Sequence, residues 1–385
     1  MKPGLKRTIL SGLPMMIIWV ACVASTSAQA VQQQKPQMAE EVFKNIPALK
    51  GIPVDEFMDT MGMYSAALGM NCTDCHTPDS TSAWANFASE TPLKQKARRM
   101  TLMVNNINKN NFGGVQAVTC FTCHQGDRRP RKVASLAVQY SAPFEEPNDL
   151  QIPAGGFSGA PSADQVFNKY IQAVGGPQKI SGLTSFVAKG TYEGYDTFHV
   201  KSPIEVYAKA PAQRTSIGHL VFGDKIAVFD GRNGWFSSPD KPSPLISLTG
   251  GNLEGARLDA MVLFPAQIKQ MATQWRVGTA SIDDKDVVAV QGTSGNLPPV
   301  NLYFDETTGL LLRMTRFADT AVGTVPTQTA FSDYRDVAGV KVPFRWVTTW
   351  TDNETITEFT EIQLNATIEA AKFARPAPAP PPKLQ

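Results

Sequence analysis

The chain has 385 residues, a length that suggests two or three domains. Hydrophobic residues make up 42% and charged residues 18%, with 36 Lys and Arg against 34 Asp and Glu, as in an ordinary globular protein. A net charge of +2 argues against a nucleic-acid-binding protein, which normally carries a large basic excess. The chain also lacks the repeated apolar runs of about 20 residues that a polytopic membrane protein needs.

The first 30 residues have the pattern of a secretory signal peptide. A basic segment at 2–7 precedes an apolar run at 13–23, and the small residues of Ala28-Gln29-Ala30 occupy the cleavage positions. The apolar run is too short to cross a bilayer of about 30 Å as a helix. We therefore expect export to the periplasm with cleavage near Ala30. A lipoprotein signal ending at Cys22, which would associate the chain with a membrane, is the alternative.

Four of the 5 cysteines lie in two copies of one short pattern. The pattern C-x-x-C-H occurs at Cys72, Cys75 and His76, and again at Cys120, Cys123 and His124. Two thiols on one helical turn add across the two vinyl groups of a haem, and the adjoining histidine reaches the iron from the same face. The pattern therefore predicts two covalently bound haem c groups. A structural zinc site and a thioredoxin-like redox pair are the competing interpretations, but neither requires a histidine after two tandem cysteine pairs.

Each haem iron needs a sixth ligand, and the composition favours methionine. The chain has only 4 histidines, and the two outside the motifs, His199 and His219, lie far downstream. Those two are more typical of surface or core histidines than of ligands. Residues 31–150 are rich in methionine, whose thioether is a soft iron ligand, although a methionine in a helix is often only core filler.

Two helical segments precede the two motifs. Apolar residues recur at helical spacing over 53–68 and 92–108, and Met61 and Met100 lie in the middle of the apolar rows. In the second segment Thr91-Pro92 supplies an N-cap and a first-turn proline. The same unit thus occurs twice, a helix with methionine followed by C-x-x-C-H. Met58 and Met103, one turn away, are the nearest rival ligands.

The stretches EFMDTMGMYSAALGMNCTDCH (56–76) and KARRMTLMVNNINKNNFGGVQAVTCFTCHQG (96–126) resemble the first two haem segments of the cytochrome c subunit of bacterial photosynthetic reaction centres. In that family the Met of EFxxxM and the Met of ARRM are axial ligands. The resemblance therefore implies Met61 with His76 at the first haem, and Met100 with His124 at the second.

The resemblance is partial, because it covers about residues 50–132 and the family has four haem motifs where this chain has two. It implies electron donation to the photo-oxidised pigment pair of a reaction centre. A dihaem relative that serves another periplasmic electron chain fits the residues equally well. The expected partners are therefore periplasmic or membrane-bound redox proteins, a reaction-centre-like complex among them.

Ligation by His and Met fills both axial positions of the iron and raises its reduction potential, as in an electron carrier. We therefore expect an electron-transfer protein rather than an enzyme, and no Ser-His-Asp or carboxylate constellation indicates catalysis. A dihaem peroxidase, which needs a vacant or releasable sixth position, is the enzymatic alternative.

Basic residues lie beside both sites, at 98–99 and at 128–132. They suit haem propionates or an acidic redox partner, and a solvated charge run is the equally ordinary interpretation.

The C-terminal half has a different pattern. A helix is expected over 162–174, and short alternating strands follow from 184 to 367, interrupted by a helical stretch at 253–271. The segments FDGRNGWFSSP, FDETTGLLLR and DYRDVAGVKVPFRW resemble the LolA/LolB-like half-barrel of periplasmic lipoprotein carriers. That resemblance implies a cavity for a lipid or a quinone. An accessory domain that docks a partner or the envelope is the alternative.

Together these patterns predict a mainly α dihaem c-type cytochrome domain followed by an α+β domain with a curved antiparallel sheet. The expected boundaries are a signal peptide at 1–30, a dihaem domain at 31–140, a Pro/Gly-rich linker at 141–163, a LolA-like domain at 164–372 and a Pro/Ala-rich disordered tail at 373–385. The alternative for the whole molecule is a lipid- or quinone-binding envelope protein with an accessory redox domain.

Overall fold

The computed structural model describes residues 35–141 and 159–380, together with residues 1, 4, 148, 150, 152 and 153. The chain forms two units, Met1–Lys35 and Pro36–Gln385, and all that follows concerns the second. Nearly all of the expected signal peptide, with Cys22, lies outside the described residues. Among the described helices, none has the length and apolar character needed to cross a membrane.

The N-terminal part of the second unit, residues 36–141, is a set of helices joined by loops and 3-10 turns. The helices are α1 (Ala39–Val42), α2 (Val54–Leu68), α3 (Cys72–Cys75), α4 (Pro92–Asn111), α5 (Cys120–His124) and α6 (Leu136–Gln139), with η1 (Pro78–Ser82) and η2 (Trp84–Ala88) between α3 and α4. The two longest, α2 and α4, confirm the helices expected over 53–68 and 92–108. Thr91 caps α4 as expected, because its Oγ1 accepts a hydrogen bond from the Lys94 amide.

The C-terminal part is built on one large antiparallel sheet. Its described strands are β1 (Ser185–Gly194), β2 (Ser202–Lys209), β3 (Gln213–Leu220), β4 (Gly223–Phe229), β5 (Gly234–Ser237), β6 (Ile246–Ser247), β7 (Gln274–Ile282), β8 (Lys285–Ser294), β9 (Leu297–Asp305), β10 (Leu311–Thr320), β11 (Gly323–Val337), β12 (Val340–Trp350) and β13 (Asn353–Leu364). Their order is β6-β5-β4-β3-β2-β1-β13-β12-β11-β10-β9-β8-β7. Two meanders therefore meet where β1 pairs with β13, and the sheet predicted from the alternating sequence is confirmed.

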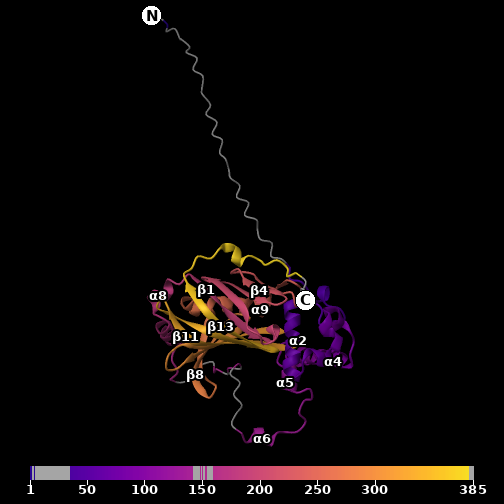
Figure 1. The fold of residues 1–385 in the computed structure, drawn as a ribbon. Coiled ribbons are helices and arrows are strands. Elements are labelled where there is room, and N and C mark those ends of the chain that lie inside the picture. The colour runs from indigo at the N-terminus through magenta and orange to yellow at the C-terminus, as the bar shows by residue number, and fades with distance from the viewer. Residues whose placement is uncertain are drawn as a thin grey trace. The chain divides into compact units, whose positions relative to one another are not determined.

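Helices cover one face of this sheet, which curves around them (Figure 1). Helix α9 (Gly250–Met261) packs against β3 and β4 on one side and against β9 and β10 on the other. These strands are far apart in the sheet order, so the sheet must bend toward α9 to reach it from both sides. Helix α7 (Ala163–Ala173) and the 3-10 turn η4 (Pro265–Gln270) complete the layer, and α8 (Pro177–Ser181) follows α7. The helices expected over 162–174 and 253–271 are thus confirmed.

The main hydrophobic core lies between this helical layer and the inner face of the sheet. Phe167 of α7, Leu258 of α9 and Ile268 of η4 are almost fully buried against strand residues such as Leu302 and Phe331. Burying such side chains contributes about 1.5–3 kcal/mol each, so this layer carries much of the stability of the fold.

Two segments that the sequence predicts to lie outside the folded domains contact the sheet. In the expected linker, the side chain of Asn148 accepts a hydrogen bond of 3.0 Å from the Thr315 hydroxyl. In the expected disordered tail, the carbonyl of Ala377 accepts one of 3.0 Å from Ser237, and the amide of Ala379 donates one of 3.0 Å to the Pro244 carbonyl. The described part of the tail is therefore ordered against the edge of the sheet, because its carbonyl and amide groups find partners there.

Candidate functional site

The first C-x-x-C-H motif forms the one-turn helix α3. Asn71 caps this helix: its side-chain oxygen accepts from the Asp74 amide at 3.2 Å, and its amide donates to the Asp74 carboxylate at 2.8 Å. Such a reciprocal capping box stabilises a turn that is too short to form alone. Cys72 is exposed and Cys75 is half-buried, and neither is in a disulfide.

The second motif forms α5 and is capped in the same way. The Thr122 amide donates to the Thr119 hydroxyl at 3.2 Å, and the Cys120 amide donates to the Val322 carbonyl at 3.1 Å. Cys123 is exposed, whereas Cys120 is buried, and burial raises the pKa of the Cys120 thiol to about 11. The two motifs thus have the same local form, and the second is hydrogen-bonded to the turn between β10 and β11.

Both motif histidines are held by a backbone carbonyl. The Nδ1 atom of His76 lies 3.1 Å from the carbonyl oxygen of Phe87, and the Nδ1 atom of His124 lies 3.0 Å from that of Asp127. A carbonyl oxygen only accepts hydrogen bonds, so Nδ1 carries the proton in each neutral ring and Nε2 keeps a free lone pair. Burial, together with the positive charge of Lys94, lowers the pKa of His76 and favours that neutral form. This is the arrangement in which proteins hold a metal-ligating histidine.

Helix α4 connects the two motifs. Near its beginning the Thr91 hydroxyl donates to the Cys75 carbonyl at 2.7 Å. Near its end the Asn108 side chain donates to the Val118 carbonyl at 2.7 Å and accepts from the Val118 amide at 2.9 Å, just before the second motif. Figure 1 shows α2, α4 and α5 together beside the sheet. The sequence predicted this helix, but not that its two ends would be hydrogen-bonded to both motifs.

The two predicted sixth ligands lie on α2 and α4. Met61 is half-buried against the apolar cluster of Ala39, Leu49 and Phe57, and its rival Met58 packs against the same cluster. Met100 is half-buried on α4, while Met103, one turn on, is 44% exposed. No contact of the described residues selects between neighbours, so Met61 and Met100 stay predictions.

Met63 is a buried residue of this site that the sequence did not indicate. It is buried on α2 in the same cluster as Ala67, Cys120 and Val322. Met63 and Ala67 are four positions apart, so they lie on one face of the helix, roughly opposite the face that carries Met61. The sequence contains this second row of apolar residues on the helix, but no local pattern indicates that the second motif packs against it.

The helical part, residues 36–141, also has an exposed apolar surface. A groove of about 450 Å³ runs along α4, lined by Leu102, Met103 and Ile107 together with Arg99 and three asparagines. Phe112, which ends α4, and Phe121 of the second motif are also exposed. Exposed apolar side chains in such number indicate a surface that something covers.

The residues present fit two haem c groups, although one of the four motif cysteines is buried. Three of the four motif thiols are exposed or half-buried, both histidines offer Nε2, and apolar side chains are available to cover a large planar ring. Only Cys120 is packed away, against the β10–β11 turn.

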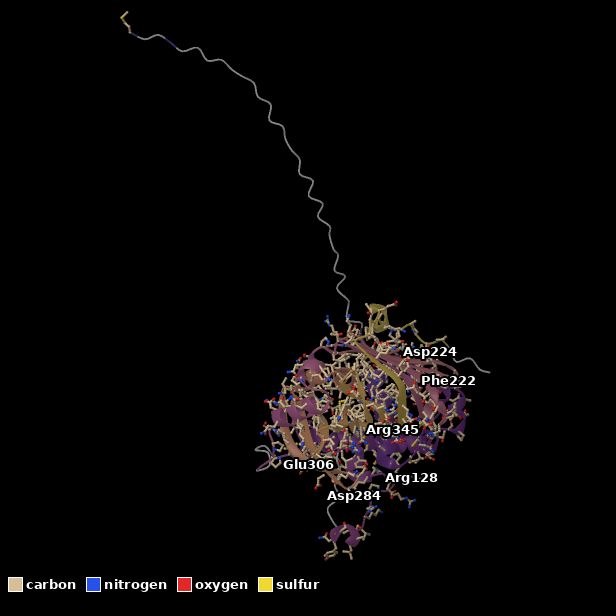
Figure 2. The ribbon with its side chains drawn as sticks, turned by 60° about the vertical axis from the view of Figure 1, so that its left-hand side comes forward. Arg128, Phe222, Asp224, Asp284, Glu306 and Arg345 are labelled. Atoms are coloured by element: carbon tan, nitrogen blue, oxygen red, sulfur yellow. The ribbon has the colours of Figure 1, made fainter. Side chains whose placement is uncertain are left out.

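The basic residues near the motifs have different surroundings. Arg98 donates to the Glu90 carboxylate at 2.7 Å and to the Asn45 carbonyl at 2.8 Å, which is a structural role. Arg128, which follows the second motif, is exposed at the lower edge of the molecule in Figure 2. The charge run at 128–132 thus remains available to a partner.

The histidines outside the motifs are surface residues. His199 is exposed in the loop after β1, and His219 on β3 lies 2.8 Å from the Asp224 carboxylate. Within the described part of the chain, no group of three or more His, Cys, Asp or Glu side chains is placed to hold a metal ion.

A second candidate site is a cavity of about 260 Å³ under α9. Inward-facing residues of eight consecutive strands in the sheet order, β4 to β10, line it, and Asp259, Val262 and Leu263 close it from the end of α9 and the residues that follow. About half of the lining residues are aromatic or aliphatic, with Trp346 and Phe331 among them. The others are mostly threonines and charged side chains, and the cavity is partly open to solvent.

The comparisons with known proteins fall into two groups, one for the N-terminal helical part and one for solved structures of LolA-like proteins. Residues 17–165 match the family model described as the photosynthetic reaction centre cytochrome C subunit. The cytochrome c subunit of the Rubrivivax gelatinosus reaction centre is 32% identical over 93 residues, which are 20% of this chain and 24% of that protein. The subunit of Thermochromatium tepidum is 33% identical over 97 residues, 24% and 23% of the two chains, and that of Roseobacter denitrificans is 28% identical over 115 residues, 28% and 30%. The resemblance predicted from the haem segments is confirmed, and the chain spans less than a third of the length of these relatives.

Similar solved structures include LolA-like proteins, the class predicted for the C-terminal part. A LolA superfamily protein from Nitrosomonas europaea has a TM-score of 0.38 at 14% identity, over 56% of this chain and 98% of that one. A putative outer membrane lipoprotein-sorting protein domain from Vibrio parahaemolyticus has a TM-score of 0.38 at 9% identity, over 55% and 97%.

Proposed function

We propose that this chain is an exported c-type cytochrome that carries electrons through two covalently bound haem groups. The observation that carries the proposal is the paired geometry of His76 and His124, each with Nδ1 on a backbone carbonyl and Nε2 free. The tandem C-x-x-C-H motifs and the similarity of residues 17–165 to reaction centre cytochromes support it.

The proposed roles follow from the chemistry of each side chain. Cys72 and Cys75 would hold the first haem and Cys120 and Cys123 the second. His76 and His124 would bind the two irons, with Met61 and Met100 as the proposed second protein ligands. A haem supplies a reversible one-electron couple at its iron. The carbonyls of Phe87 and Asp127 fix the ring orientation of the two histidines and raise their basicity as ligands. The methionine thioethers favour the reduced state, so the couple works at high potential.

The proposed partner is a periplasmic or membrane-bound redox protein, of which a photosynthetic reaction centre is one class. The exposed basic run at 128–132 directly follows the second motif, so it lies near the second haem in sequence. Complementary charge increases association rates more than affinity, which suits a carrier that must leave its partner quickly. An acidic docking surface on the partner follows from this proposal.

Haem stoichiometry and an optical redox titration test the carrier function. The protein is produced in a host that attaches c-type haem, and the haem content per chain is measured on the purified sample. We expect two low-spin haems per chain and two reversible one-electron transitions. A high-spin haem in the unmodified protein would mean an open iron position and would favour the peroxidase alternative. One haem per chain would contradict the dihaem proposal.

Substitution of the sixth ligands tests the assignment of Met61 and Met100. M61A and M100A are each expected to abolish half of the methionine-to-iron charge-transfer band of the ferric protein and to lower one of the two potentials. The matched controls are M58A and M103A, which remove a methionine one turn away on the same helices. If M58A loses the band and M61A keeps it, Met58 is the ligand. If M103A loses the band and M100A keeps it, Met103 is the ligand.

A second candidate function is binding of a lipid or quinone in the cavity under α9. The specific observation is the cavity of about 260 Å³ with its aromatic and aliphatic walls. Binding sites for apolar ligands are usually concave, largely apolar and equipped with a few polar groups.

A further inference from the structure

The walls of the cavity under α9 (Gly250–Met261) are apolar over most of their area. Trp346 and Phe331 come from β12 and β11, Met314 from β10, and Val262 and Leu263 from the chain just after α9. Trp346 is itself packed edge to face on Phe359, with ring centroids 4.6 Å apart. Such walls suit a hydrocarbon chain or a flat apolar group.

The three cations that line the cavity differ in their partners. Arg316 donates to the Asp259 carboxylate at 3.1 Å, and Lys225 lies 2.6 Å from the Asp196 carboxylate, so these two cations have counter-charges. The side chain of Arg214, the third cation that lines the cavity, forms no hydrogen bond or ion pair with any described residue. It feels the field of the same Asp259 that Arg316 already binds. Arg214 is thus the one cation of the lining without a carboxylate in direct contact in the described part of the chain.

Two N–H donors of the cavity walls also lack partners. The Nε of Arg214 and the Nε1 of Trp346 are buried without a hydrogen bond in the described part of the chain. A buried donor without a partner costs about 1–3 kcal/mol, and more when it is charged, so native proteins rarely keep one without a reason. Burial lowers the pKa of Arg214, but an arginine stays protonated in proteins, so the charge cannot be relieved by losing a proton. An acceptor in the cavity would relieve both defects.

We propose that the cavity binds a single-chain anionic amphiphile, with Arg214 as its counter-charge and Trp346 as a second donor. This inference rests on the second candidate function, binding in the cavity, and names the ligand class. A neutral quinone would leave the charge of Arg214 uncompensated. The volume of about 260 Å³ is below the roughly 300–1,000 Å³ of sites for drug-sized ligands, which favours one chain over two. The anionic group is a carboxylate, as in a fatty acid, or a phosphate monoester, as in a single-chain phospholipid.

Calorimetric titration of the full-length haem-loaded protein tests this proposal with four probes of known chemistry. These are dodecanoate, dodecyl phosphate, dodecanol as the neutral chain, and a short-chain ubiquinone, all below their aggregation concentrations. We expect both anions to bind about ten-fold or more tighter than dodecanol, since a hydrogen bond to a charged group contributes that much. The tighter of the two anions identifies the headgroup.

Variants assign the effect to Arg214. R214Q is expected to reduce dodecanoate binding to the level of dodecanol while leaving dodecanol binding unchanged. W346F should weaken dodecanoate less than R214Q does. The matched control is R276Q, which removes an exposed arginine on β7 that does not line the cavity. R214Q should unfold at the same temperature as the unmodified protein or higher, because it removes an uncompensated buried charge. An unchanged or higher unfolding temperature would show that the loss of binding in R214Q is not caused by misfolding.

The possible failures are distinguishable. If dodecanol or the quinone binds as tightly as dodecanoate, the anionic ligand class is wrong and cavity binding stands. If R214Q leaves the preference for the anion intact, Arg214 is not the counter-charge. If no probe binds, both the ligand class and the second candidate function fail, whereas electron transfer through the haems is untouched.

Discussion

At the scale of single residues, the second motif depends on one close approach between backbones. Gly69 ends α2 in the left-handed region, and the Gly126 amide donates to the Ala67 carbonyl at 3.0 Å. A Cβ on Gly69 would overlap the carbonyl oxygen of Gly126, which lies two residues after His124. A glycine is therefore required here for space as well as for conformation.

G69A should lower the free energy of unfolding by about 2 kcal/mol more than G113A does. Gly113 has nearly the same φ, 62° against 59°, but open space around its Cβ position, so both variants share the conformational strain and only G69A has the overlap. Urea unfolding of the two variants measures the difference. Equal losses would show that the backbones separate without cost.

At the scale of elements, α2 caps α9 across 194 positions of sequence. Thr249 precedes α9 but does not cap it with its own side chain. Instead the Asp55 carboxylate of α2 accepts from the Thr249 amide at 2.6 Å and from its hydroxyl at 2.9 Å. Burial raises the pKa of Asp55, and the hydrogen bonds from Thr249 offset part of that rise. Helix α2 and the helix over the cavity are thus directly connected.

D55A should cost about 1–3 kcal/mol of stability, because it leaves the donors of the half-buried Thr249 without their acceptor. Amide hydrogen exchange at Thr249 should accelerate in the same variant. The control is D164A, which breaks an exposed ion pair with Lys269 and should cost less than about 1 kcal/mol. A loss in D164A as large as that in D55A would argue against the capping role.

At the scale of the whole molecule, the cytochrome-like helices and the sheet share a hydrophobic cluster. Met63, Ala67 and Cys120 come from the helices, and Val322 and Val325 from the β10–β11 hairpin. Because neither part can bury these side chains alone, residues 36–380 should unfold as one cooperative unit. This would couple the second C-x-x-C-H motif to the sheet.

V322D is the test of this cooperativity. Val322 is fully buried in a hairpin turn, so a charge there should cost several kcal/mol and lower the unfolding temperature. The loss should appear equally in tryptophan fluorescence, which mainly follows the sheet, and in haem absorbance, which follows the helices. V221D, in the exposed β3–β4 turn, is the control. Two separate transitions would instead show two independent domains.

The sequence by itself determined whatever depends on neighbours along the chain. The C-x-x-C-H motifs, their capping residues, the two long helices before them and the alternating strands are local patterns, so Cys72 to His124 and most elements were predictable. Only the tertiary structure decided which elements meet. It placed Cys120 on the β10–β11 turn, Asp55 on α9, and Arg214 and Trp346 on the walls of one cavity. These contacts join residues more than 100 positions apart, and they depend on how a curved sheet packs against helices, which no local pattern encodes.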